Sequence, residues 1–113
     1  MIWPKNIRTE EQIIWCSGCG NFGILQALQN ALSQTGTDPS QVLAVFGIGC
    51  HGHLANYLKI NNFEGLHGRA LPLATGIKIA NQGLRVLAIA GDGDQLGEGG
   101  NHLVHASRRN PDI

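Results

Sequence analysis

Val86-Leu87-Ala88-Ile89-Ala90-Gly91-Asp92-Gly93-Asp94 is the stretch that decides the fold of this chain. Five apolar residues lead directly into two aspartates that alternate with glycines. A short, wholly apolar run is typical of a strand buried on both faces, as in a parallel sheet. Ligands of such sheets bind beyond the carboxyl ends of the strands. A carboxylate at that place suits Mg²⁺, which usually also binds phosphate oxygens, so the stretch predicts a diphosphate held through a metal.

The rest of the chain alternates between helical and strand patterns. The patterns predict helices over 21–33, 71–80 and 98–109 and strands over 42–48 and 86–90. Asn21 is the predicted N-cap of the first helix, and residues 49–66 are expected to be irregular apart from a short helical piece at 53–58. This order favours an α/β fold, a parallel sheet with flanking helices. Two strands are few for a sheet, and Asp112-Ile113 resembles the approach to another.

The bulk properties exclude several classes of protein. The 113 residues carry eight basic and eight acidic side chains, which argues against binding to nucleic acid or to an anionic membrane. No apolar run reaches the roughly 20 residues that span a bilayer, and the N-terminus, Met1–Lys5, has no signal-peptide h-region, so we expect a cytoplasmic protein. The first 15 residues are expected to be irregular and anchored by Trp3, Ile13, Ile14 and Trp15.

The three cysteines, Cys16, Cys19 and Cys50, are an odd number, which fits a disulfide framework poorly. The Cys16–Cys19 pair precedes a predicted helix, as in thioredoxin-type redox motifs, but no core strand is predicted before it. A zinc site would need a histidine as its fourth ligand, and an iron–sulfur cluster would need a fourth cysteine. Cys50 could equally be a buried small side chain, and spacing alone leaves these alternatives open.

The aspartates and histidines also allow more than one interpretation. Asp92 and Asp94 could belong to an EF-hand-type calcium loop, although Leu96 occupies a ligand position, or to a solvated surface turn. A helix beginning near Glu98 would direct free N–H groups toward the same cleft. His67 could donate a hydrogen bond to a phosphate oxygen or be an exposed loop residue. The remaining histidines are expected to line the cleft or to be surface or core residues: His51, His53, His102 and His105.

Four segments together resemble one enzyme family. They are Trp15–Gly23, Gly47–Cys50, Gly65–Ala70 and the run from Gly91–Asp94 to Gly99–His102. In this order they are similar to the β subunit of the 2-oxoacid:ferredoxin oxidoreductases, thiamine-diphosphate enzymes that include pyruvate and 2-oxoglutarate forms. The resemblance covers almost the whole chain from Trp15. It implies oxidative decarboxylation of a 2-oxoacid with coenzyme A, giving acyl-CoA, CO₂ and reduced ferredoxin.

The resemblance also implies roles for individual residues. Asp92 would be a Mg²⁺ ligand, and Gly91, Gly93 and Asp94 would lie beside the diphosphate. Gly49, Cys50 and His67 would line the cofactor pocket. Cys16, Cys19 and Cys50 would be three ligands of a [4Fe–4S] cluster. The expected partners are an α subunit, which supplies the carboxylate that activates the cofactor, and ferredoxin.

The family pattern continues past Ile113, where its fourth cysteine and its Asn ligand to Mg²⁺ lie. We therefore interpret residues 1–113 as the N-terminal part of one thiamine-diphosphate-binding domain, and expect weak cofactor binding and no turnover by this chain alone. Two rival hypotheses remain. One is a non-catalytic module that uses its cysteines to bind a metal, and the other is a non-oxidative thiamine-diphosphate decarboxylase.

Overall fold

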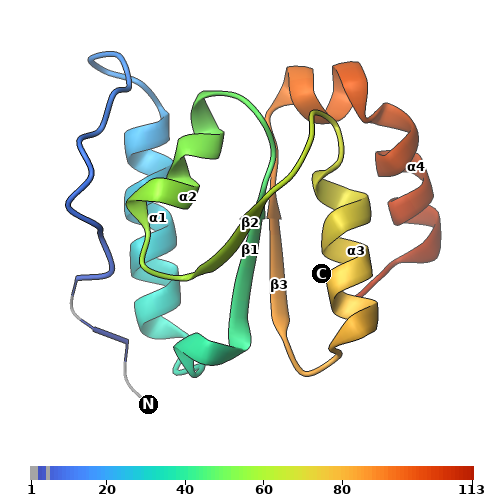
Figure 1. Cartoon of the computed structure of the whole chain (residues 1–113), viewed down its shortest axis with the longest axis horizontal. Helices are drawn as coiled ribbons and strands as arrows, with labels where there is room; N and C mark the ends of the chain where they lie inside the picture. Colours follow the sequence, from blue (N-terminus) through green and yellow to red (C-terminus); the bar gives the residue numbers. More distant parts are fainter. Residues whose placement is uncertain (1–2, 5) are drawn as a thin grey trace.

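Three parallel strands form the sheet, in the order β2-β1-β3. The computed structural model describes residues 3–4 and 6–113; Met1, Ile2 and Lys5, on which part of the signal-peptide prediction depends, lie outside the described residues. The elements are α1 (Asn21–Gln34), β1 (Val42–Phe46), α2 (Leu54–Tyr57), β2 (Asn61–Glu64), α3 (Ala70–Ala80), β3 (Arg85–Ile89) and α4 (Gly100–Arg109). Helices α1 and α2 lie on one side of the sheet and α3 on the other, with α4 packed beside α3 (Figure 1). The predicted α/β fold with a parallel sheet and flanking helices is confirmed.

Strand β1 is the centre of the core because its side chains are buried on both faces. Val42, Ala44 and Phe46 pack with Leu25 and Leu32 of α1 in one hydrophobic cluster. Val45, on the opposite face, packs with Ala70 and Ala74 of α3 and with Val86 of β3 in a second cluster. A strand with apolar contacts on both sides needs an unbroken apolar run, which is the pattern that predicted it.

Strands β1 and β3 pair in parallel from Val42 opposite Arg85 to Phe46 opposite Ile89. The pairing continues one residue further, where the Gly47 N–H donates to the Ile89 carbonyl over 2.8 Å. The chain segments after both strands therefore emerge side by side at the carboxyl edge of the sheet, at the top of Figure 1.

Strand β2 was missed by the sequence prediction, which treated residues 49–66 as irregular. It pairs in parallel with β1, with Leu43 opposite Asn61 and Phe46 opposite Glu64. All four residues of β2 are exposed, so an edge strand of this kind carries neither an apolar run nor an alternating pattern. The sheet has three described strands rather than the two predicted.

The helix predictions are right in number, and two details of them are wrong. Asn21 is the first residue of α1, and the cap is Gly20, which has no side chain to accept a hydrogen bond from the first turn. The helix predicted from Glu98 is preceded by a π-helical segment, Gly93–Glu98, and α4 itself begins at Gly100. The helical backbone therefore starts at Asp92, whose φ and ψ are already those of an α-helix.

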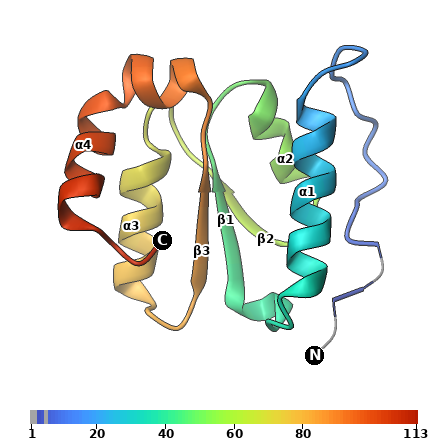
Figure 2. The same ribbon diagram turned by 180° about the vertical axis from the view of Figure 1, so that it is seen from behind.

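The segment before α1 runs along the outside of that helix (Figure 2). Trp3, Ile7 and Trp15 are buried in the larger core cluster, and Ile13 packs against it. Ile14, predicted as an anchor, is 68% exposed. No helix among the described residues is both long and apolar enough to cross a membrane.

Candidate functional site

A cleft of about 450 Å³ lies at the carboxyl ends of β1 and β3. Its walls are formed by Asn21 and Ile24 of α1, by residues 48–51 after β1, and by residues 89–94 at the end of β3 and beyond. The cleft lies where ligands bind to parallel sheets. Six of the residues predicted from the sequence line it: Gly49, Cys50, Gly91, Asp92, Gly93 and Asp94.

The two aspartates of the loop after β3 lie in opposite environments. Asp92 is exposed at the start of the helical segment, whereas the Asp94 side chain is only 2% exposed. The Asp94 Oδ1 accepts a hydrogen bond of 2.6 Å from the Gly68 N–H. Asp92 is thus free to coordinate a cation, and Asp94 fixes one loop to another. In an EF-hand both carboxylates would face a single ion.

Gly47 makes room for Asp94. A Cβ at Gly47 would lie 1.7 Å from the Asp94 Oδ2 and 3.1 Å from the His51 Nε2. Gly47 is buried at the end of β1. A glycine at this position therefore makes it possible to bury the Asp94 carboxylate between the two strand ends.

His67 is exposed and is not among the residues that line the cleft. The loop that carries it is nevertheless fixed against the residues after β3. Gly68 has a φ of +69°, and a Cβ on it would lie 2.6 Å from the Gly99 nitrogen. Together with the Gly68–Asp94 hydrogen bond, this close backbone contact fixes the backbone at Gly68, directly after His67.

The three cysteines are free thiols. Cys16 and Cys50 are exposed and Cys19 is half-buried, so Cys50 is not a buried core residue. The described residues before Cys16 contain no strand, only an isolated bridge from Arg8 to Leu58, which removes the setting that a thioredoxin-type motif requires. Across residues 3–4 and 6–113, no three His, Cys, Asp or Glu side chains converge to hold a metal ion, so the structure assembles neither a zinc site nor the three cysteines into one ligand group.

Trp15 links the two cysteine segments, and its role was missed by the sequence reasoning. Its indole Nε1–H donates a hydrogen bond of 2.6 Å to the Cys50 carbonyl, 35 residues away. The ring packs edge-on against Phe22 at 5.3 Å and Tyr57 at 5.0 Å between centroids. Trp15 therefore holds the backbone of Cys50 beside the segment that contains Cys16 and Cys19.

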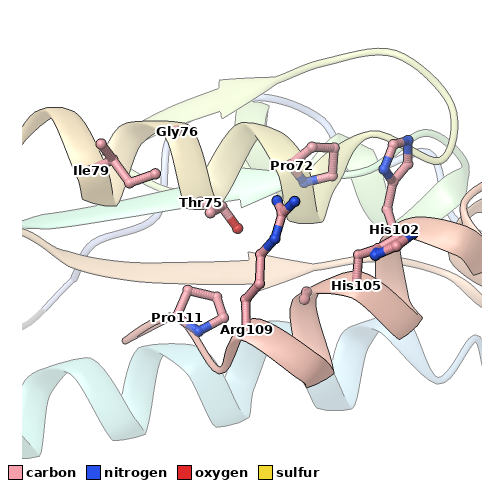
Figure 3. A pocket seen from close by; sticks show the side chains of 9 residues that line it. Pro72, Thr75, Gly76, Ile79, His102, His105, Arg109 and Pro111 are labelled. Atoms are coloured by element: carbon pink, nitrogen blue, oxygen red, sulfur yellow. The ribbon is translucent and has the colours of Figure 1, made fainter.

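A second hollow, of about 260 Å³, lies between α3 and α4 (Figure 3). His102, His105 and Arg109 share the face of α4 that borders it, as their spacing predicts. The Arg69 Nη1 lies 2.7 Å from the His102 Nε2. None of the predicted cofactor or cysteine residues lines this hollow, so it is separate from the cleft.

The chain belongs to a family of thiamine-diphosphate enzymes. Residues 47–113, more than half of the chain, match the family described as "Thiamine pyrophosphate enzyme, C-terminal TPP binding domain". The match includes most of the cleft and both aspartates.

Among its relatives are subunits of 2-oxoacid oxidoreductases. The chain is 49% identical over 106 residues to the 2-oxoacid:ferredoxin oxidoreductase 2 subunit beta of Aeropyrum pernix, covering 94% of this chain and 34% of that protein. It is 52% identical over 101 residues to a 2-oxoacid:ferredoxin oxidoreductase subunit beta of Saccharolobus solfataricus, covering 88% of this chain and 33% of that protein. It thus spans about a third of the length of these curated relatives.

A solved structure has the same fold. It is the 2-oxoglutarate:ferredoxin oxidoreductase from Magnetococcus marinus with 2-oxoglutarate, coenzyme A and succinyl-CoA bound. The match has a TM-score of 0.89 at 38% identity and covers 98% of this chain and 38% of that one. The resemblance drawn from the four sequence segments is confirmed.

Proposed function

We propose that this chain forms the diphosphate-binding part of a 2-oxoacid:ferredoxin oxidoreductase. The observation that carries the proposal is the cleft at the carboxyl ends of β1 and β3, lined by glycines and bordered by the exposed Asp92. The chain's family and its oxidoreductase relatives support the same assignment.

The donor set at the cleft fits Mg²⁺ with a diphosphate. Mg²⁺ is usually bound by one or two carboxylates together with phosphate oxygens and water. Asp92 offers an exposed carboxylate, and a Cβ at Gly93 would contact nothing within 4 Å, so the backbone there is open to a bulky group. In this proposal Asp92 binds the metal, and Gly49, Gly91, Gly93 and Asp94 border the diphosphate.

His67 is proposed to complete the polar surroundings of the diphosphate. It is exposed and can therefore donate a hydrogen bond to a group outside the described residues. The contact between Gly68 and Asp94 fixes the loop on which it lies. A loop whose backbone is already fixed loses less conformational entropy on binding than a mobile one.

The cysteines offer three of the four thiolates that a [4Fe–4S] cluster needs. Cys16 and Cys50 are exposed free thiols, and Trp15 ties the backbone of Cys50 to the segment that carries the other two. We propose Cys16, Cys19 and Cys50 as cluster ligands on this basis. The cleft-lining position of Cys50 would bring such a cluster close to the diphosphate cofactor.

The chemistry divides between the cofactor and the chain. Bound thiamine diphosphate supplies the nucleophilic carbon and stabilises the negative charge left when CO₂ departs. Ile24, Ile48 and Ile89 give the cleft an apolar wall, and charge interactions are stronger where water is excluded. The overall proposed reaction converts a 2-oxoacid, coenzyme A and oxidised ferredoxin into acyl-CoA, CO₂ and reduced ferredoxin. An α-type subunit is the proposed partner.

The test uses Cys16→Ser in the anaerobically assembled enzyme that contains this chain. The variant is expected to lose iron and ferredoxin reduction while it still releases CO₂ from the 2-oxoacid. Ser17→Ala, at the neighbouring exposed position, is the matched control and should retain both activities. Native enzyme that contains no iron after reconstitution, or that releases no CO₂ from any 2-oxoacid, would refute the proposal.

A further inference from the structure

The buried end of the cleft holds two polar atoms that have no partner. The His51 Nε2 and the Asp94 Oδ2 are both buried, and neither has a hydrogen-bond partner among the described residues. They lie 3.8 Å apart, and the side chains are 11% and 2% exposed. Leaving a buried polar atom unpaired costs free energy, so two such atoms that face each other are best explained as a pair.

Three glycines leave the space for this pair. A Cβ at Gly47 would lie 1.7 Å from the Asp94 Oδ2. A Cβ at Gly49 would lie 3.3 Å from the His51 Nδ1, and a Cβ at Gly91 would lie 3.2 Å from the same atom. A side chain at Gly47 would displace the carboxylate, and one at Gly49 or Gly91 would press on the imidazole.

The hydrogen-bonding capacity of Asp94 determines the role of each imidazole nitrogen. The Asp94 Oδ1 already accepts the Gly68 N–H, and an ionised carboxylate can only accept. The Oδ2 therefore requires a donor, and the His51 Nε2, 3.8 Å away, can supply one. A movement of about 1 Å brings the two atoms from 3.8 Å to hydrogen-bond distance. In a neutral imidazole with its proton on Nε2, Nδ1 is an acceptor.

The Nδ1 of His51 lies near two glycines of the cleft wall. Its neighbours are Gly49 and Gly91, both of which line the cleft. We propose that Asp94 fixes His51 as the Nε2–H tautomer and thereby presents Nδ1 as a hydrogen-bond acceptor in the cleft wall. His51 is then a positioning and specificity residue that accepts a hydrogen bond from an N–H or O–H group of the bound ligand at this point of the cleft wall.

Which ligand meets the Nδ1 of His51 depends on the proposed function. The tautomer itself is a property of the free chain. At about pH 8, where an ordinary histidine is neutral, ¹⁵N NMR of the imidazoles is expected to give a protonated Nε2 and an unprotonated Nδ1 for His51. The chain has five histidines, and the loss of one set of signals in His51→Gln assigns them.

Asp94→Asn should abolish this preference, because its amide can donate to Nε2 and so favours the Nδ1–H tautomer. Asp92→Asn, which changes a carboxylate in the same loop, is the control and should leave the His51 signals unchanged. A native Nδ1–H tautomer, or signals that do not change in Asp94→Asn, would overturn the inference.

A second measurement keeps the inference testable if Asp94→Asn does not fold. The amide nitrogen of Gln reaches the position of Nε2, whereas the amide of Asn reaches only that of Nδ1. His51→Gln is therefore expected to unfold about 5 °C above His51→Asn. Equal unfolding temperatures, or the reverse order, would overturn the pairing. Failure of the proposed function is distinguishable, since it would appear as absent Mg²⁺-dependent thiamine diphosphate binding while the tautomer stays as described.

Discussion

The cleft has an exposed rim and a buried floor, and the residues of the two regions differ in how much they contribute to folding. The rim consists of Cys50 and Asp92, which are exposed. The floor consists of Gly47, His51 and Asp94, where a carboxylate 2% exposed is enclosed between two strand ends. Side chains of the rim are exposed to a ligand, whereas the Asp94 carboxylate of the floor is buried and held by the Gly68 N–H. We therefore expect substitutions in the floor to affect folding and those in the rim to affect binding.

The largest effect is expected for Gly47→Ala. Its Cβ would lie 1.7 Å from the Asp94 Oδ2, and such a clash in a buried site forces the carboxylate or the backbone to move. We expect the free energy of unfolding to fall by about 3 kcal/mol, measured by chemical denaturation.

Gly76→Ala is the matched control, because Gly76 lies in α3 and a Cβ there would contact nothing within 4 Å. It should stabilise the chain by about 0.5–1 kcal/mol, since alanine favours helix. A Gly47→Ala variant as stable as Gly76→Ala would show that the floor is not tightly packed.

The next largest effect is a difference in stability between substitutions of the two aspartates. Asp94→Ala removes the acceptor of the buried Gly68 N–H and is expected to cost about 2 kcal/mol, because hydrogen bonds to charged groups are worth more than neutral ones. Asp92→Ala, at the exposed position, should change the free energy of unfolding by no more than about 0.5 kcal/mol. Similar losses for both variants in denaturant titrations would contradict the distinction between floor and rim.

A smaller loss of stability is expected at Trp15, which links the rim residue Cys50 to the hydrophobic core. Trp15→Phe keeps an aromatic ring between Phe22 and Tyr57 but removes the hydrogen bond to the Cys50 carbonyl. The expected loss of stability is about 1 kcal/mol, together with faster alkylation of Cys50 by a maleimide, followed by mass spectrometry. Unchanged alkylation of Cys50 would mean that Trp15 does not hold this part of the rim.

The smallest effect is expected at Asp38, a surface carboxylate outside the cleft. Hydrogen bonds from the Ser40 N–H and Oγ lower the pKa of Asp38 below its usual value. Because the folded-state pKa is the lower one, these bonds stabilise the fold above the unfolded pKa, and the contribution is lost as the pH falls through the folded pKa. The free energies of unfolding of Asp38→Asn and of the native chain, measured by denaturant titration at a series of pH values, should therefore converge in acid. A difference between them that grows as the pH falls would contradict this.

The sequence predicted those features that depend on continuous apolar runs and glycine-rich turns. The strand before Gly91, the helices and the cleft at the strand ends follow from such patterns. Strand β2 was not predictable because all four of its residues are exposed, and an edge strand obtains its stability from backbone pairing rather than from apolar side chains. The pattern Gly-Asp-Gly-Asp also gives no sign that its second aspartate turns inward, since this depends on Gly47 and Gly68, which are distant in sequence.

The most direct test of the central claim is calorimetric titration of thiamine diphosphate into the chain, with and without Mg²⁺, for the native sequence and Asp92→Asn. The account predicts weak binding that requires Mg²⁺ and is reduced at least tenfold, by about 1.4 kcal/mol or more, in Asp92→Asn at an unchanged unfolding temperature. Binding of equal strength in the two proteins, or binding that does not depend on Mg²⁺, would contradict the assignment of Asp92 as the metal ligand of the rim.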